Sequence, residues 1–90
     1  MIKHISISVK GKVQGVFFRA HTEKTAIKIG IHGFVRNEND GSVYIEAQGN
    51  PDQLDEFVKW CKEGPDRAKV DEIITSEIPL MQEEGFRVRR

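Results

Sequence analysis

The feature that most constrains this chain is the stretch from Gly11 to Arg19, where an alternating apolar pattern ends and a helical pattern begins. Gly11 and Gly15 lie on either side of the predicted turn, and glycine tolerates the backbone conformations that a tight turn needs. Such a turn brings successive N–H groups to face one point, which makes a cradle for an anion. The stretch therefore predicts a strand, a glycine loop and a helix in immediate succession.

Arg19 stands where that helix should begin. A cation at a helix N-terminus opposes the helix dipole by roughly 0.3 to 1 kcal/mol, and a bound anion would remove the conflict. A guanidinium group also binds phosphate oxygens through two parallel hydrogen bonds. We therefore expect a phosphate-like dianion to bind the loop amides together with Arg19.

The segments on either side of the loop have clear periods. Residues 2–10 alternate between apolar and polar side chains, which predicts a strand with one buried face. The apolar side chains of that strand are Ile5, Ile7 and Val9. Helical spacing then predicts an amphipathic helix from about Arg19 to Ile29, with Gly30 as its C-cap. The apolar face of the helix carries Phe18, Thr22, Ala26 and Ile29, and the expected solvent-facing side carries Glu23, Lys24 and Lys28.

A hairpin is predicted next. Residues 33–37 form a short strand, and residues 38–41 form a turn in which the Asp40-Gly41 pair supplies left-handed conformations. The returning strand is marked by the alternation of Val43, Ile45 and Ala47.

The second half of the chain repeats the alternation of helix and strand. Asn50, Pro51 and Gln53 are placed as N-cap, first helical residue and capping-box partner of a second helix. Its apolar face carries Leu54, Phe57, Val58 and Cys61, and it ends at Gly64 and Pro65. Residues 69–78 predict a fourth strand, and residues 86–89 a short edge strand. In the fourth strand Val70, Ile74 and Ile78 are in phase and Ile73 is out of phase.

The order strand, helix, strand, strand, helix, strand is typical of an α+β fold, the ferredoxin-like βαββαβ sandwich. Two helices cover one face of its antiparallel sheet, and the tail here would add a short extra strand. With 90 residues and 38% hydrophobic content, the chain suits one domain spanning residues 1–90. In this topology the first two strands run parallel with the third between them, so their carboxyl ends share one edge. We therefore expect Arg19 and Asn37 to converge there.

Two motifs in these segments resemble the signatures of the acylphosphatase family. The first is Gly11-Lys12-Val13-Gln14-Gly15-Val16-Phe17-Phe18-Arg19, and the second is Gly33-Phe34-Val35-Arg36-Asn37 followed by Asp40-Gly41. The likeness extends to Gly64-Pro65, Ala68, Val70 and residues 86–89, so it covers essentially the whole chain. Phe34 stands where the family very often has tryptophan, a change between two large aromatics that removes no catalytic group.

The resemblance implies a small monomeric hydrolase that cleaves the carboxyl–phosphate bond of acyl phosphates. It implies that Arg19 binds the phosphate and that Asn37 holds the attacking water. The phosphate-binding loop would comprise Gly15, Val16, Phe17, Phe18 and Arg19. Neither motif holds a carboxylate pair, a serine–histidine pair or a metal-ligand cluster, so no cofactor and no metal is expected.

Other interpretations of the same residues stay open. Arg19 could be a solvated arginine at a helix start, and Asn37 could be only a turn residue. A noncatalytic ferredoxin-like module could bind a phosphorylated ligand or RNA through the same loop. RNA binding of the usual kind needs exposed aromatics on central strands, where this chain offers Ser6, Ser8 and a single Tyr44.

The charge balance and the cysteine content limit the kinds of partner and metal site that we expect. The chain has 14 Lys and Arg against 14 Asp and Glu, so it lacks the global field that attracts nucleic acid or an anionic membrane. Arg87, Arg89 and Arg90 form a basic tail for which two interpretations stay open: solvated charge, or a contact of Arg90 with its own terminal carboxylate or a neighbouring acid. The N-terminus lacks the apolar core of a signal peptide, which favours a cytoplasmic protein. Cys61, the only cysteine, is predicted to fill the core, and the scattered His4, His21 and His32 are not expected to be metal ligands.

Overall fold

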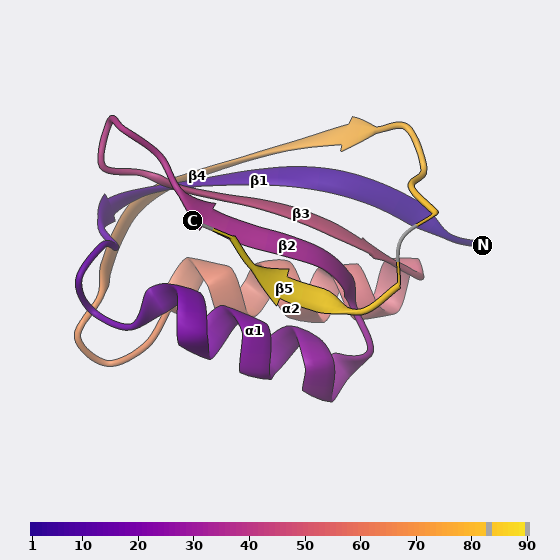
Figure 1. Ribbon diagram of the computed structural model, residues 1–90, viewed down its shortest axis with the longest axis horizontal. Helices are drawn as coiled ribbons and strands as arrows, with labels where there is room; N and C mark the ends of the chain where they lie inside the picture. Colours follow the sequence, from indigo (N-terminus) through magenta and orange to yellow (C-terminus); the bar gives the residue numbers. More distant parts are fainter. Residues whose placement is uncertain (83, 90) are drawn as a thin grey trace.

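The computed structural model describes residues 1–82 and 84–89, so Arg90 of the basic tail lies outside the described residues. Seven elements follow one another in the predicted order (Figure 1). They are β1 (Lys3–Lys12), α1 (Phe18–Ile29), β2 (His32–Asn37), β3 (Val43–Gly49), α2 (Pro51–Glu63), β4 (Lys69–Ile78) and β5 (Phe86–Val88).

The strands form one sheet in the order β4-β1-β3-β2-β5. β1 pairs antiparallel with β3 and β4, and β2 pairs antiparallel with β3. Both helices lie along the same face of the sheet (Figure 1). The predicted ferredoxin-like sandwich is therefore confirmed, and β3 separates the parallel strands β1 and β2 as expected.

The C-terminal strand is also confirmed, and its place in the sheet is new information. β5 pairs parallel with β2, with Phe34 opposite Arg87, so the five-stranded sheet is mixed. This pairing makes β5 an edge strand beside β2, which ends in Asn37, and places the tail close to the first helix (Figure 1).

The core fills the space between the sheet and the two helices. Six helix-facing strand residues are completely buried and come from β1, β2 and β3: Ile7, Val9, Val35, Val43, Ile45 and Ala47. They meet buried helix side chains, namely Phe18, Ala26, Leu54, Phe57 and Cys61. Full burial of one large aliphatic or aromatic side chain contributes about 1.5–3 kcal/mol, so this layer holds the helices on the sheet.

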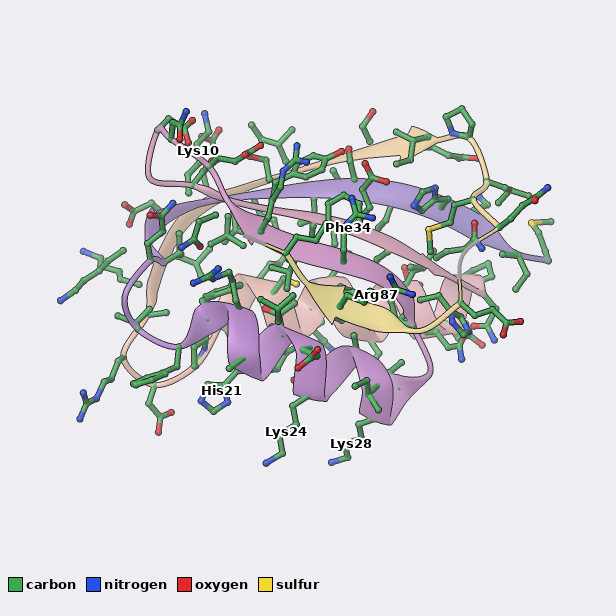
Figure 2. The ribbon with its side chains drawn as sticks, viewed as in Figure 1. Lys10, His21, Lys24, Lys28, Phe34 and Arg87 are labelled. Atoms are coloured by element: carbon green, nitrogen blue, oxygen red, sulfur yellow. The ribbon has the colours of Figure 1, made fainter. Side chains whose placement is uncertain are left out.

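The helix ends match their sequence signals. The Asn50 side chain accepts a hydrogen bond from the Gln53 amide, and the Gln53 side chain accepts one from the Asn50 amide, both at 2.8 Å. Gly30 ends α1 with φ 98°. Lys24 and Lys28 project from α1 into solvent, away from the sheet (Figure 2). Within the described residues, neither helix is long and apolar enough to cross a membrane.

The predicted phase of β4 is wrong. Glu72 pairs with Lys10 but Val70 pairs with Gly11, so one residue of β4 is extra at this point, a β-bulge. The bulge lets Val70 and Ile73 both pack against the core, whereas Ile74 points away and is 48% exposed. Simple alternation fails here because a bulge changes the face on which every later residue lies.

Gly11 belongs to this bulge rather than to the loop. β1 continues through Gly11 to Lys12, and Gly11 has φ 129°. A Cβ atom at Gly11 would collide with the carbonyl group of Lys69 on the neighbouring strand. The first glycine of the motif therefore permits close strand approach, and only Gly15 shapes the loop itself.

Candidate active site

The loop between β1 and α1 is held from below by apolar side chains. Val13 and Val16 are buried, and between them Gly15 is exposed with φ 75°. Phe17 is also left-handed, with φ 63°, and its side chain is 69% exposed. A left-handed residue other than glycine costs about 1–2 kcal/mol. Backbone strain of this kind concentrates at functional sites.

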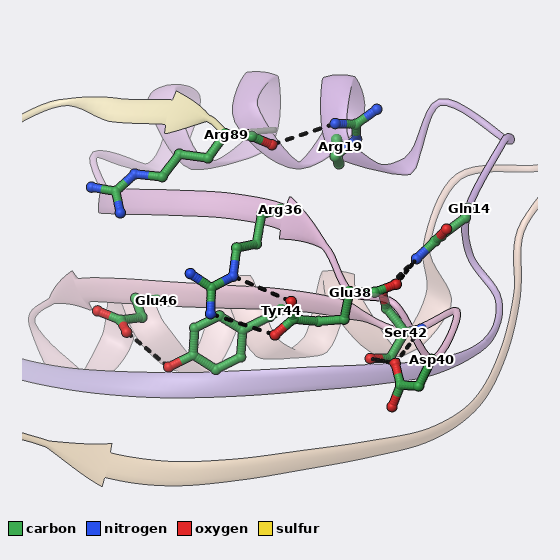
Figure 3. A network of polar contacts seen from close by, with 9 residues as sticks. All are labelled: Gln14, Arg19, Arg36, Glu38, Asp40, Ser42, Tyr44, Glu46 and Arg89. Carbon is green, nitrogen blue, oxygen red and sulfur yellow. Dashed lines mark hydrogen bonds and ion pairs between the residues drawn. The ribbon is translucent and has the colours of Figure 1, made fainter.

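Gln14 ties this loop to the β2–β3 turn. Its side-chain nitrogen donates hydrogen bonds to the carbonyl oxygens of Glu38 and Ser42, each at 2.8 Å (Figure 3). The turn is itself braced, because Asp40 Oδ1 accepts from the Ser42 hydroxyl at 2.6 Å and from the Ser42 amide at 2.9 Å. These two hydrogen bonds hold the pKa of the Asp40 carboxyl below its usual value. The loop and the turn are thereby fixed relative to each other.

Arg19 and Asn37 line one pocket, as the strand order predicts. The pocket has a volume of about 710 Å³, in the range of small-molecule sites. Its walls are Val13, Gly15, Phe17, Phe18, Arg19, Ala20, Glu23, Asn37 and Val88. Of the five predicted loop residues, Val16 alone does not line the pocket, because its side chain turns into the core.

Arg19 lies in the first turn of α1, a turn that contains no acidic residue. Its side chain is partly buried, and Nη1 donates a long hydrogen bond of 3.4 Å to the carbonyl oxygen of Arg89 (Figure 3). The positive end of the helix dipole and the guanidinium group thus occupy the same wall of the pocket. Both favour an anion at this position.

Asn37 is the last residue of β2 and shares a strand face with the buried Val35. That face is the one covered by the helices, which directs Asn37 toward the start of α1. Its side-chain oxygen Oδ1 is buried and accepts no hydrogen bond from any described residue. A buried acceptor without a donor costs about 1–3 kcal/mol, so its presence calls for an explanation.

The neighbouring Arg36 points to the opposite face of the sheet, because successive residues of a strand alternate between its two faces. Its guanidinium carbon lies 4.8 Å from the centre of the Tyr44 ring, and Nε is 3.4 Å from the Glu38 carboxylate (Figure 3). Phe34 is buried on this face too, with the Arg89 guanidinium 4.0 Å above its ring. Phenylalanine therefore packs well where tryptophan is frequent in the family.

The three histidines lie apart. His4 is buried and its Nδ1 is 2.6 Å from the Pro79 carbonyl oxygen, whereas His32 Nδ1 accepts a hydrogen bond from the Gly85 amide. His21 is exposed on α1. Across residues 1–82 and 84–89, the His, Cys, Asp and Glu side chains form no group that could hold a metal ion.

Two pocket walls, Glu23 and Val88, were not foreseen from the sequence, and neither was Gln14, which lies outside the pocket and braces its loop. Gln14 stands inside the first motif, but spacing alone does not tell how far its side chain reaches. Val88 lines the pocket only because β5 pairs with β2. The Arg89 backbone amide extends this pairing by donating a hydrogen bond to the Val35 carbonyl oxygen at 2.8 Å. Glu23 was expected to face water, but it is half-buried in the pocket wall, one helical turn beyond Arg19.

Comparison with known proteins gives a consistent family. A sequence model of the acylphosphatase family matches residues 5–88. An acylphosphatase of Marinobacter nauticus is 53% identical over 75 residues, which cover 83% of this chain and 82% of that protein. One of Rubrobacter xylanophilus is 42% identical over 88 residues, covering 97% of this chain and 80% of that protein.

Solved structures agree in fold over nearly every residue. An acylphosphatase from Coxiella burnetii superposes with a TM-score of 0.94 at 38% identity, covering 98% of this chain and 93% of that chain. The acylphosphatase from Bacillus subtilis superposes with a TM-score of 0.93 at 34% identity, covering all of both chains. With its two motifs, its sheet order and these relatives, the chain belongs to the acylphosphatase family.

Proposed function

We propose that the pocket at the start of α1 hydrolyses the carboxyl–phosphate bond of acyl phosphates to a carboxylate and inorganic phosphate. Arg19 and the backbone amides of residues 15–19 bind the phosphoryl group, and Asn37 holds the water that attacks it. The observation that carries these roles is the presence of Arg19, Asn37 and the glycine loop in one pocket.

The loop supplies fixed donors for the phosphoryl oxygens. The left-handed residues Gly15 and Phe17 turn the backbone of the loop where the helix begins, so that amide groups and the helix dipole point the same way. Arg19 adds a planar pair of charged donors. Such preorganised groups stabilise charge that spreads over the phosphoryl oxygens during transfer.

Asn37 is suited to hold a water molecule. Its buried oxygen has no donor among the described residues and can accept a hydrogen bond from water. An amide does not take a proton at neutral pH, so Asn37 orients the nucleophile without acting as a base. We propose that an oxygen of the bound phosphoryl group receives the water proton instead.

The chemistry of the leaving group explains why two catalytic side chains suffice for hydrolysis. Attack of water on phosphorus breaks the bond to the acyl oxygen and releases a carboxylate, which is stable as an anion near neutral pH because carboxyl pKa values lie near 4. No general acid is needed. Charge balances as well, since an acyl phosphate dianion and water give a carboxylate and dihydrogen phosphate. The task is therefore dominated by positioning and electrostatics.

Hydrolysis of benzoyl phosphate by purified variants tests these roles. Arg19→Ala and Asn37→Ala should each lower kcat at least about 100-fold, the scale of losing one preorganised donor, while circular dichroism stays unchanged. Arg19→Lys should recover little, because lysine keeps the charge but loses the planar fork. Inorganic phosphate should inhibit competitively.

Two matched variants control for the loss of an arginine or an asparagine as such. Arg87→Ala removes an exposed arginine of β5, and Asn39→Ala removes an exposed asparagine two residues beyond Asn37. Both should retain full turnover. Near-normal activity in Arg19→Ala or Asn37→Ala would remove the role assigned to that residue.

We further propose that residues 1–90 act as one domain, as a monomer in the cytoplasm, with the small acyl phosphate as partner. The continuous core and the single buried Cys61 support this view, because a protein of oxidising compartments more often carries disulfides. Light scattering coupled to gel filtration should give the mass of one chain. A stable dimer at micromolar concentration would contradict the monomer.

A further inference from the structure

The pocket that contains Arg19 also contains a carboxylate. Glu23 lies four residues after Arg19, on the same face of α1, and its side chain is half-buried. Binding a phosphoryl dianion does not call for a negative charge nearby, since like charges repel. Phosphoryl binding therefore does not account for the presence of the Glu23 carboxylate in this pocket.

The charge of Glu23 is not cancelled by an ion pair. In the part of the chain that the structure describes, the ion pairs join His4 to Glu46 and Arg36 to Glu38. The other cations of α1, Lys24 and Lys28, project into solvent on the side away from the sheet (Figure 2). Arg19 and Glu23 share the pocket, so the charges of both act on whatever occupies it.

Apart from Asn37, the remaining walls are nonpolar. Phe17 contributes an aromatic side chain that is 69% exposed, and Val88 of β5 and Ala20 of α1 add aliphatic surface. Under the function proposed above, the loop amides and Arg19 engage the phosphoryl group. The walls that these groups do not form include Phe17, Val88 and Glu23. Covering this apolar surface favours an apolar acyl group.

We propose that Phe17, Val88 and Glu23 form the acyl-group site, and that Glu23 acts there as a charge filter. The site takes acyl phosphates whose acyl part is apolar and either uncharged or positively charged. It discriminates against acyl parts that carry a carboxylate, because that carboxylate would lie beside Glu23. This assignment rests on the proposed function and names the substrate class of the same site.

Three rigid substrates test the filter: benzoyl phosphate, 4-carboxybenzoyl phosphate and 4-trimethylammoniobenzoyl phosphate. For each enzyme, kcat/KM of each charged substrate is divided by that of benzoyl phosphate. Comparing this ratio between enzymes cancels the intrinsic reactivity of the substrates. Glu23→Gln should raise the ratio for the carboxylate substrate about threefold to tenfold and lower it for the cation, as expected for removing one nearby charge.

A matched control and a salt series sharpen the result. Glu56→Gln removes an exposed carboxylate on α2, outside the pocket, and should keep both ratios of the wild type. Raising KCl from about 0.05 M to about 0.5 M should narrow the difference between the wild type and Glu23→Gln, because salt screens partly exposed charges.

Several outcomes would overturn the filter. Equal ratios in the wild type and Glu23→Gln would show that Glu23 does not sense the acyl group. An equal loss with all three substrates would mean that Glu23 serves to position Arg19 instead. If the wild type hydrolysed none of the three, the proposed function would fall together with the filter, whereas hydrolysis with unchanged ratios would overturn the filter alone.

Discussion

The side-chain nitrogen of Gln14 lies 2.8 Å from the carbonyl oxygen of Ser42, and this hydrogen bond joins the glycine loop to the β2–β3 turn. A second bond of the same length reaches the carbonyl of Glu38, the residue after Asn37. The loop carries the proposed phosphate donors, and β2 carries the proposed water holder. Gln14 therefore sets the distance between the two halves of the site.

Replacing Gln14 by alanine should lower kcat/KM about 10-fold, because small displacements of catalytic groups lower the reaction rate strongly. Loss of two hydrogen bonds should also lower the free energy of unfolding by about 1–3 kcal/mol, measured in urea. Gln14→Glu should be worse than Gln14→Ala, since it places a carboxylate against two carbonyl oxygens. Gln82→Ala, at an exposed glutamine, is the control. A Gln14→Ala protein that is less stable but fully active would contradict the positioning role.

Most of the fold could be predicted because its signals are local. The capping box at Asn50 and Gln53 depends on residues three apart, and the Asp40-Gly41 turn fixes its hairpin within a few residues. The place of β5 and the bulge opposite Gly11 depend instead on which backbones meet across the sheet. Hydrophobic alternation within one strand carries no information about its partner, so Val70 was placed in phase with Ile74 and not with Ile73.

The candidate site also contains features that the sequence predicts and features that it does not. Strand order alone brings Arg19 and Asn37 to one edge, because Arg19 follows β1, Asn37 ends β2, and the topology fixes the direction of both strands. The contributions of Gln14 and Val88 could not be predicted. One depends on the reach of a side chain across the loop, and the other on the late pairing of β5. A sequence pattern predicts where a strand or helix ends more readily than which residues a side chain contacts.

Cys61 should report on global unfolding. The thiol is fully buried, and burial raises its pKa, so in the folded protein it is neither accessible nor ionised. An aromatic disulfide reagent at mildly alkaline pH should label the native protein at least about 1000-fold more slowly than the protein in guanidinium chloride, given the usual stability of folded domains. Because Cys61 is the only cysteine, the signal is unambiguous. Rapid labelling of the native protein would show local opening of α2.

Tyr44 should titrate at unusually high pH. Partial burial, followed by the hydrogen bond that its hydroxyl donates to Glu46 at 2.8 Å, raises the pKa of Tyr44 to about 12. The folded state thus holds the phenolic proton more tightly than the unfolded state does. This contribution to stability is complete below about pH 10, the usual tyrosine pKa, and is lost as the pH rises toward 12.

Ultraviolet absorbance of the phenolate measures this directly, because Tyr44 is the only tyrosine. The midpoint should fall in Glu46→Gln, which removes the neighbouring charge, and should return to the ordinary value of about 10 in denaturant. Glu56→Gln, at an exposed glutamate of α2, should leave the midpoint of the wild type. A wild-type midpoint near that of the denatured chain would contradict the assignment.

The left-handed backbone of Phe17 should invert the usual order of alanine and glycine. Phe17 has φ 63° and an exposed side chain, so truncating it removes little buried surface. Phe17→Gly should be more stable than Phe17→Ala by about 1 kcal/mol in urea, because only glycine adopts this conformation without strain. At the exposed helical position Lys24 the order should reverse, with Lys24→Ala more stable than Lys24→Gly by about 1 kcal/mol. The same order at both positions would show that Phe17 is not strained.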